Sequence, residues 1–124
     1  VIISILTDHQ VHLVESDHRK CAFLRTVLSR VNSDATIHEK RLENMENIKA
    51  DIITARAFAP TPKLLKLTKK QHHSKLRFLL LKGRDVDSEL INIDTSQKLQ
   101  LTNKYASITS KDGCVIELQF IDPI

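Results

Sequence analysis

Short apolar runs alternate along the chain with stripes of apolar residues at helical spacing. The runs at 11–14, 35–38 and 76–81 each predict a buried strand. The run at 76–81 is continuous, which is typical of a parallel strand covered on both faces. Between the first two runs, a helix is predicted to end near residue 30. Its apolar stripe consists of Cys21, Leu24, Leu28 and Val31.

Polar residues mark where the helices begin. Residues 1–6 are apolar from the first position and carry no start signal, so we interpret them as the tail of a helix. Ser16 or Asp17 can cap the helix that follows the first run. The segment 61–70 predicts another helix, with Thr61 as its cap and a proline in its first turn. Its inner side is predicted to hold Leu64, Leu65 and Thr68, and its outer side Lys63, Lys66 and Lys70.

The C-terminal part has the pattern of an antiparallel hairpin. Strands are predicted over 97–108 and 114–121, joined by a turn at 111–113. Short helices are predicted over 85–91 and, as a helix or turn, over 45–50. The order of elements predicts one α/β domain with a mostly parallel sheet and an antiparallel end.

The stretch 51–60, DIITARAFAP, organises the rest of the chain. Ile52 and Ile53 predict a strand that stops at Thr54, which leaves Arg56 in the following loop. In parallel α/β sheets ligands bind beyond the carboxyl ends of the strands. Arg56 could therefore bind a carboxylate or phosphate, or it could be a surface arginine paired with a nearby acid.

Positive charge is concentrated in the middle of the chain. Residues 52–84 contain nine basic residues and no acidic one, a net charge of +9, whereas the whole chain carries +4 and the remainder therefore −5. Such clustering raises the local potential for a polyanion, so we favour nucleic acid as a partner. The alternative is a solvated charged face.

An acid stands at the end of the first predicted strand. Glu15 could accept hydrogen bonds from both ribose hydroxyls of a nucleotide cofactor. It could also simply favour the N-terminus of the next helix through the helix dipole.

Several classes of protein do not fit the composition. No apolar run reaches the ~20 residues of a membrane helix, and no signal-peptide pattern opens the chain. Cys21 and Cys114 are interpreted as reduced thiols, and His72 and His73 as part of a solvated turn rather than a metal site. We therefore expect a cytoplasmic monomer without a metal.

The motifs VHLVESDHRKCAFLRTVLSR, EKRLENM, DIITARAFAPTPKLLKL and LRFLLLKG occur in that order. Together they resemble the bacterial ribosomal RNA small-subunit methyltransferase G family, also called glucose-inhibited division protein B. The resemblance implies a Rossmann-like class I methyltransferase fold. It also implies transfer of methyl from S-adenosylmethionine to guanine N7 of 16S rRNA.

The resemblance assigns roles to individual residues. Glu15 matches the acid that holds the cofactor ribose, with Ser16 and Asp17 beside it. Leu42 and Glu43 match the pair along the adenine. Arg56 matches the arginine of the cofactor and active-site loop, and Lys82 matches the lysine that closes the fifth strand. The resemblance therefore implies that Arg56 and Lys82 are the catalytic residues, with Lys82 acting near the RNA. RNA contacts are expected from Lys63, Lys66, Lys70 and Arg84.

One part of the family pattern is missing. Members carry a first strand and a glycine-rich cofactor loop ahead of the helix whose tail we assign to residues 1–6, whereas this chain has only Gly83 and Gly113. The chain thus resembles the last two-thirds of the enzyme, and we expect it to bind cofactor weakly by itself.

The implied chemistry asks little of side chains, because guanine N7 already carries a lone pair and no base must remove a proton. What remains is to position the reacting atoms and exclude water. Two alternatives stay open, a non-catalytic RNA-binding fragment and a nicotinamide-dependent oxidoreductase. The C-terminal hairpin favours the methyltransferase over the oxidoreductase.

Overall fold

The computed structural model describes residues 1–56, 61–83, 99–108 and 113–121. The chain forms two compact units, Val1–Met45 and Glu46–Ile124. That the two belong to a single domain stays a prediction. No helix within the described ranges is long and apolar enough to cross a membrane.

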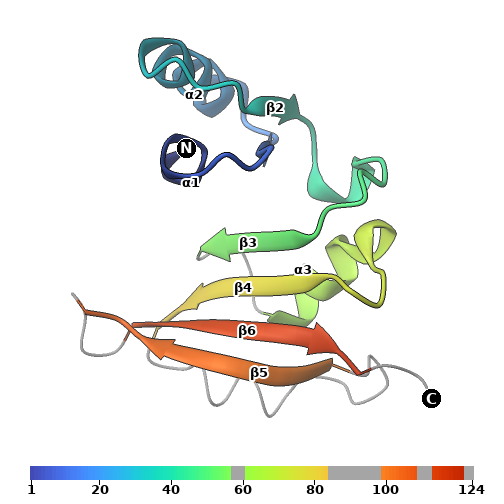
Figure 1. Ribbon diagram of the computed structural model, residues 1–124. Coiled ribbons are helices and arrows are strands. Elements are labelled where there is room, and N and C mark those ends of the chain that lie inside the picture. The colour runs from blue at the N-terminus through green and yellow to red at the C-terminus, as the bar shows by residue number, and fades with distance from the viewer. Residues whose placement is uncertain (57–60, 84–98, 109–112, 122–124) are drawn as a thin grey trace. The chain divides into compact units, whose positions relative to one another are not determined.

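The first unit alternates helices and strands, as predicted (Figure 1). Its elements are α1 (Ile2–Leu6), β1 (His12–Glu15), α2 (His18–Arg30), β2 (Thr36–Glu39) and the 3-10 helix η1 (Leu42–Asn44). The interpretation of residues 1–6 as helical is confirmed. The short helix or turn predicted over 45–50 does not form there, because the helical turn falls earlier, in η1.

Helix α2 begins where the sequence predicts and buries two of the four residues of the predicted stripe. Asp17, rather than Ser16, is its N-cap. Cys21 and Leu28 are buried, whereas Val31 is 42% exposed, so its assignment to the inner stripe is wrong. The physical reason is that α2 ends at Arg30 and Val31 has left the helical conformation.

Strands β1 and β2 pair in parallel with Glu15 directly beside Glu39. Both strands therefore end at the same edge with an acid. On one face of this pair His12 Nδ1 lies 2.9 Å from His38 Nε2, and the two rings stack with centroids 5.2 Å apart. A hydrogen bond between two ring nitrogens requires that one of them be unprotonated.

The second unit is a four-stranded sheet in the order β3-β4-β6-β5. Its elements are β3 (Ile52–Arg56), α3 (Thr61–Leu67), η2 (Lys69–Gln71), β4 (Arg77–Lys82), β5 (Leu99–Ala106) and β6 (Cys114–Phe120). β3 and β4 are parallel, whereas β6 is antiparallel to both of its neighbours (Figure 1). The predicted antiparallel C-terminal end is confirmed.

One face of this sheet forms the core of the unit. Phe78 and Leu80 of β4 lie beside Leu118 and Ile116 of β6, and all four are buried. The ring of His72, which follows η2, contacts Phe78 and Phe120 from this face, with centroids 5.8 and 5.0 Å away. The interpretation of His72 as a solvated residue is therefore wrong, because aromatic side chains pack against it.

The opposite face of the sheet is less covered than the apolar sequence predicts. Leu79 is half-buried and Leu81 is 40% exposed, so the expectation that β4 is covered on both faces is not met within the described residues. Here the antiparallel partner β6 places polar side chains, Glu117 and Gln119, on the same face as these leucines.

Thr61 is already helical and does not cap α3. Its side chain is fully buried, and among the described residues its hydroxyl oxygen has no hydrogen-bond partner. The predicted helix 61–70 divides at Thr68 into α3 and η2. The predicted short helix 85–91 and most of the predicted turn 111–113 lie outside the described residues.

Candidate cofactor-binding site

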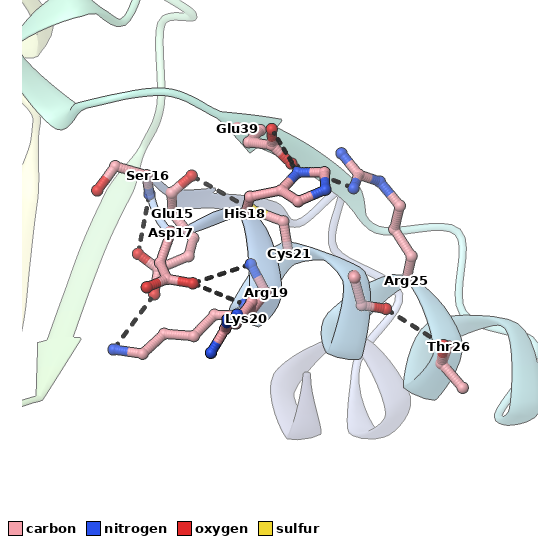
Figure 2. Close-up of polar contacts among 11 residues, drawn as sticks. Glu15, Ser16, Asp17, His18, Arg19, Lys20, Cys21, Arg25, Thr26 and Glu39 are labelled. Atoms are coloured by element: carbon pink, nitrogen blue, oxygen red, sulfur yellow. Dashed lines mark hydrogen bonds and ion pairs between the residues drawn. The ribbon is translucent and has the colours of Figure 1, made fainter.

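The end of β1 presents a carboxylate that its own turn holds in place (Figure 2). One carboxylate oxygen of Glu15 accepts the backbone N–H of Ser16 at 2.9 Å. The other oxygen lies 3.8 Å from the ammonium of Lys20. A carboxylate has about four acceptor positions, so Glu15 can still accept hydrogen bonds from a ligand.

The backbone of Glu15 is held from two sides. Its carbonyl oxygen accepts the N–H of Lys40, which follows β2, at 3.0 Å. It also accepts the thiol of Cys21 at 3.3 Å. The residue at the candidate ribose position is thus fixed both to the neighbouring strand and to α2.

Asp17 completes the turn by capping α2. Its carboxylate accepts the backbone N–H groups of Arg19 and Lys20 at 2.9 and 3.1 Å. A cap of this kind satisfies two of the donors that a helix N-terminus leaves without partners. Asp17 is therefore occupied with the helix, and its first role is to shape the turn rather than to meet a ligand.

A second acid, Glu39, ends β2 at the same edge. His18 Nδ1 lies 3.1 Å from one of its oxygens, and Arg25 donates to the other at 3.2 Å (Figure 2). The hydrogen bond from His18 is the main reason that the pKa of the Glu39 carboxyl lies below its ordinary value, and Arg25 lowers it further. Glu39 is therefore a carboxylate at neutral pH.

Cys21 is buried beneath this edge and is not a nucleophile. Burial is the main reason that the pKa of its thiol is raised, and the carboxylate of Glu39 adds to the effect. A thiol with a raised pKa stays protonated at neutral pH and is inert. Cys21 and Cys114 are both free, which confirms the prediction of reduced thiols.

The pair expected along the adenine follows this edge closely. Leu42 and Glu43 lie in η1, three and four residues after Glu39. Leu42 is half-buried and Glu43 is exposed. The first unit thus carries five of the six residues expected to bind cofactor, Glu15, Ser16, Asp17, Leu42 and Glu43.

The sixth residue, Arg56, belongs to the second unit. The prediction that it lies in a loop is wrong, because β3 extends through Arg56 and pairs it with Leu81 of β4. Arg56 and Lys82 are the last residues of neighbouring parallel strands, so both lie at the carboxyl edge of the sheet. Because side chains alternate along a strand, Lys82 projects from the face opposite to Arg56.

The predicted outer side of α3 is exposed. Lys63 and Lys66 of α3 and Lys70 of η2 are all exposed, whereas Leu64, Leu65 and Thr68 are buried, as predicted. Arg84, the fourth residue expected to contact RNA, lies outside the described residues. Groups of three or more side chains that could hold a metal ion do not occur in the described ranges.

Sequence reasoning missed Glu39 and its two partners. It gave neither His18 nor Arg25 a role. Two signals were present: Glu39 closes its strand as Glu15 closes the preceding one, and His18 and Arg25 are seven residues apart, hence on one side of a helix.

Comparison with known proteins gives a family match. Residues 1–114 match the family model described as rRNA small subunit methyltransferase G. The curated protein called ribosomal RNA small subunit methyltransferase G from Paramagnetospirillum magneticum is 35% identical over 96% of this chain and 58% of its own length. The protein of that name from Zymomonas mobilis is 37% identical over 99% of this chain and 55% of its own length. The one from Bartonella quintana is 38% identical over 90% of this chain and 52% of its own length. The chain spans about half the length of these relatives.

Solved structures of low sequence identity share the fold. A mutant of MtNAS in complex with S-adenosylmethionine superposes with a TM-score of 0.78 and 11% identity, over 98% of this chain and 49% of that one. The dimethyltransferase RosA from Streptomyces davawensis superposes with a TM-score of 0.67 and 12% sequence identity. The match covers 90% of this chain and 42% of RosA. The expected Rossmann-like methyltransferase fold is confirmed.

Proposed function

Because this chain belongs to the rRNA small subunit methyltransferase G family, we propose that the complete gene product transfers methyl from S-adenosylmethionine to guanine N7 of 16S rRNA. The observation that carries the proposal is the family match over residues 1–114. The hydrogen-bonded turn at Glu15 supports it independently, since an acid at the carboxyl end of a parallel strand suits a ribose.

The residues of the first unit fit the adenosine part of the cofactor. Glu15 is anchored by Ser16 and retains free acceptor positions, which the two hydroxyls of a ribose would occupy. Leu42 and Glu43 follow β2 at the same edge, where we expect them to lie along the adenine. Bound S-adenosylmethionine supplies an electrophilic methyl group on a sulfonium.

The chain's own residues then have to bind, orient and exclude water. Guanine N7 needs no general base, which agrees with a buried and protonated Cys21 beside the site. We expect the guanidinium of Arg56 to fork onto the cofactor carboxylate or onto a phosphate beside the target base. Lys82 ends the neighbouring strand and is proposed to act near the RNA.

The RNA partner is proposed from charge. Three exposed lysines, Lys63, Lys66 and Lys70, lie within the basic segment 52–84, and we propose that they contact phosphates together with Arg84. We further propose that the protein acts in the cytoplasm, because 16S rRNA is made and assembled there, and that it acts as a monomer.

The proposal is tested by methyl transfer from labelled S-adenosylmethionine to small-subunit rRNA lacking the modification. Nuclease digestion and mass spectrometry should identify 7-methylguanosine, and Glu15→Ala should reduce the initial rate at limiting cofactor. An Asp8→Ala variant is a matched control, since Asp8 is an exposed acid of the same unit. RNA binding with no transferred methyl at any cofactor concentration would favour a non-catalytic RNA-binding role instead.

A further inference from the structure

Two acids stand side by side where β1 and β2 end. Glu15 and Glu39 are register partners in a parallel pair, whose strands lie about 4.8 Å apart. Carboxylates placed so closely repel each other unless cations or donors separate them. The structure resolves this conflict with side chains from a single helix, α2.

The two acids receive different partners from that helix. The carboxylate of Glu15 forms an ion pair with Lys20, whereas the carboxylate of Glu39 contacts His18 and Arg25. Figure 2 shows the two carboxylates turned apart, with Glu15 toward Lys20 and Glu39 toward His18 and Arg25. The side chain of Glu39 therefore ties two turns of α2 to the end of β2.

The end of β2, which Glu39 attaches to α2, also contacts the backbone of Glu15. The residue immediately after it, Lys40, donates its backbone N–H to the Glu15 carbonyl at 3.0 Å. From the other side, Cys21 of α2 donates its thiol to the same carbonyl. One of the groups that hold the Glu15 backbone thus belongs to α2, and the other directly follows β2, the two elements that Glu39 joins.

We infer that Glu39 is a positioning residue for cofactor binding, which acts through His18 and Arg25 to hold α2 and the end of β2 in the arrangement that aims Glu15 at the ribose. This inference rests on the proposed function, because it presumes that Glu15 binds the cofactor. Glu39 itself is turned toward α2 and is not proposed to touch the cofactor.

The consequence is specific to cofactor affinity. Without Glu39, the Lys40 and Cys21 bonds remain possible, but α2 loses the contacts that His18 and Arg25 make with the end of β2. We therefore expect Glu15 to occupy more than one position. A ligand then meets Glu15 in its binding position only part of the time, and its apparent affinity falls by that fraction. Once the cofactor is bound, the rate of methyl transfer should be unchanged.

The test uses the complete gene product and its Glu39→Ala and Glu39→Gln variants. Calorimetric titration with S-adenosylmethionine should give a Kd about tenfold higher for Glu39→Ala, or about 1.4 kcal/mol. The amide of Glu39→Gln still accepts hydrogen bonds from His18 and Arg25, so its Kd should lie between those of Glu39→Ala and the parent. With each variant, kcat at saturating cofactor should stay within about twofold of the parental value, while KM for the cofactor rises.

Two controls separate positioning from mere stability. Asp34→Asn neutralises an exposed acid of the same unit and should leave Kd unchanged. His18→Ala combined with Glu39→Ala should bind no more weakly than Glu39→Ala alone, because the two residues act through one contact. If Glu39→Ala does not fold, Glu39→Gln carries the test.

A Kd for Glu39→Gln and Glu39→Ala equal to that of the parent overturns the inference, as does a Kd that rises only in step with a fall in melting temperature. If Glu15→Ala weakens binding while the Glu39 variants do not, this inference fails and the proposed function stands. If the parent protein does not bind S-adenosylmethionine, the proposed function fails and this inference falls with it.

Discussion

The guanidinium of Arg77 in β4 lies 3.4 Å from a carboxylate oxygen of Glu117 in β6, across an antiparallel strand pair. Glu117 is only 4% exposed, and it also accepts hydrogen bonds from Asn103 at 2.6 Å and from Gln119 at 3.1 Å. One member of the basic segment 52–84 is therefore engaged within the sheet. Arg77 should not be counted among the charges available to RNA.

Glu117→Ala should destabilise the protein. The change leaves Asn103 and Arg77 without their acceptor in a partly buried place, at a cost of about 1–3 kcal/mol. Urea unfolding of each protein measures this as a lower midpoint with an unchanged slope. Glu46→Ala removes an exposed carboxylate of the same unit and should lie within about 0.5 kcal/mol of the parent.

The same carboxylate predicts a dependence on pH. The hydrogen bond from Asn103 is the main reason that the pKa of Glu117 lies below its ordinary value of 4.5. A lowered folded-state pKa means that the stabilisation is complete above pH 4.5 and is lost as the pH falls through the folded-state value. The difference in unfolding free energy between the parent and Glu117→Gln should be constant from pH 5 to pH 7 and shrink below pH 4.5. A constant difference down to pH 3 would contradict the assignment.

Thr61→Val should stabilise the protein or leave its stability unchanged. The Thr61 hydroxyl is fully buried and has no partner in the part of the chain that the structure describes, and valine replaces it with a methyl group of similar shape. Leaving a buried polar group unpaired costs about 1–3 kcal/mol, and valine removes that cost. Thr61→Ser keeps the hydroxyl and loses only the methyl group, so it should destabilise. A thermal melt in which valine is clearly worse than serine would indicate that the hydroxyl has a partner after all.

Glu15→Ala should weaken cofactor binding by about 1–3 kcal/mol, because ribose hydroxyls would lose their charged acceptor. Calorimetry on the complete gene product measures the effect, with Asp8→Ala as the control. Equal affinity in Glu15→Ala and the parent would remove Glu15 from the site.

Reversing Lys63, Lys66 and Lys70 to Glu should flatten the dependence of RNA affinity on salt. Each phosphate contact releases counterions, so loss of three contacts should reduce the slope of log affinity against log salt by roughly 2–3. A charge-matched control reverses Arg19, Arg30 and Lys40, which are exposed in the first unit. Equal slopes in the two triple variants would mean that the lysines of α3 and η2 face away from RNA.

Arg56→Lys should lose most methyl transfer while the fold is retained. An ammonium cannot fork onto a carboxylate or phosphate as a guanidinium does. Arg56 is exposed at the end of β3, so its replacement should change the unfolding free energy by no more than about 0.5 kcal/mol. Single-turnover transfer of labelled methyl, paired with thermal melting, measures both quantities, and Arg30→Lys is the control. Parental activity in Arg56→Lys would make Arg56 an ordinary surface charge.

The sequence by itself determined the elements whose signals are local. The apolar run at 76–81 predicted β4, and the pair Ser16 and Asp17 after β1 predicted a cap of α2, which the structure assigns to Asp17. Both signals are local, because backbone preferences and capping depend on residues near in the chain. The same local reading placed Glu15 at a strand end, and the motifs around it indicated the family.

Contacts that depend on strand register were decided only by the tertiary structure. Arg56 joined β3 rather than a loop because β4 provides a partner strand as far as Leu81. Arg77 met Glu117, forty residues away, because β6 returns antiparallel beside β4. Glu39 gained His18 and Arg25 because parallel pairing brought its strand end to the side of α2. No pattern within a short stretch of sequence specifies which strands become neighbours or in which register they pair. The partners of Arg56, Arg77 and Glu39 depend on both the neighbours and the register.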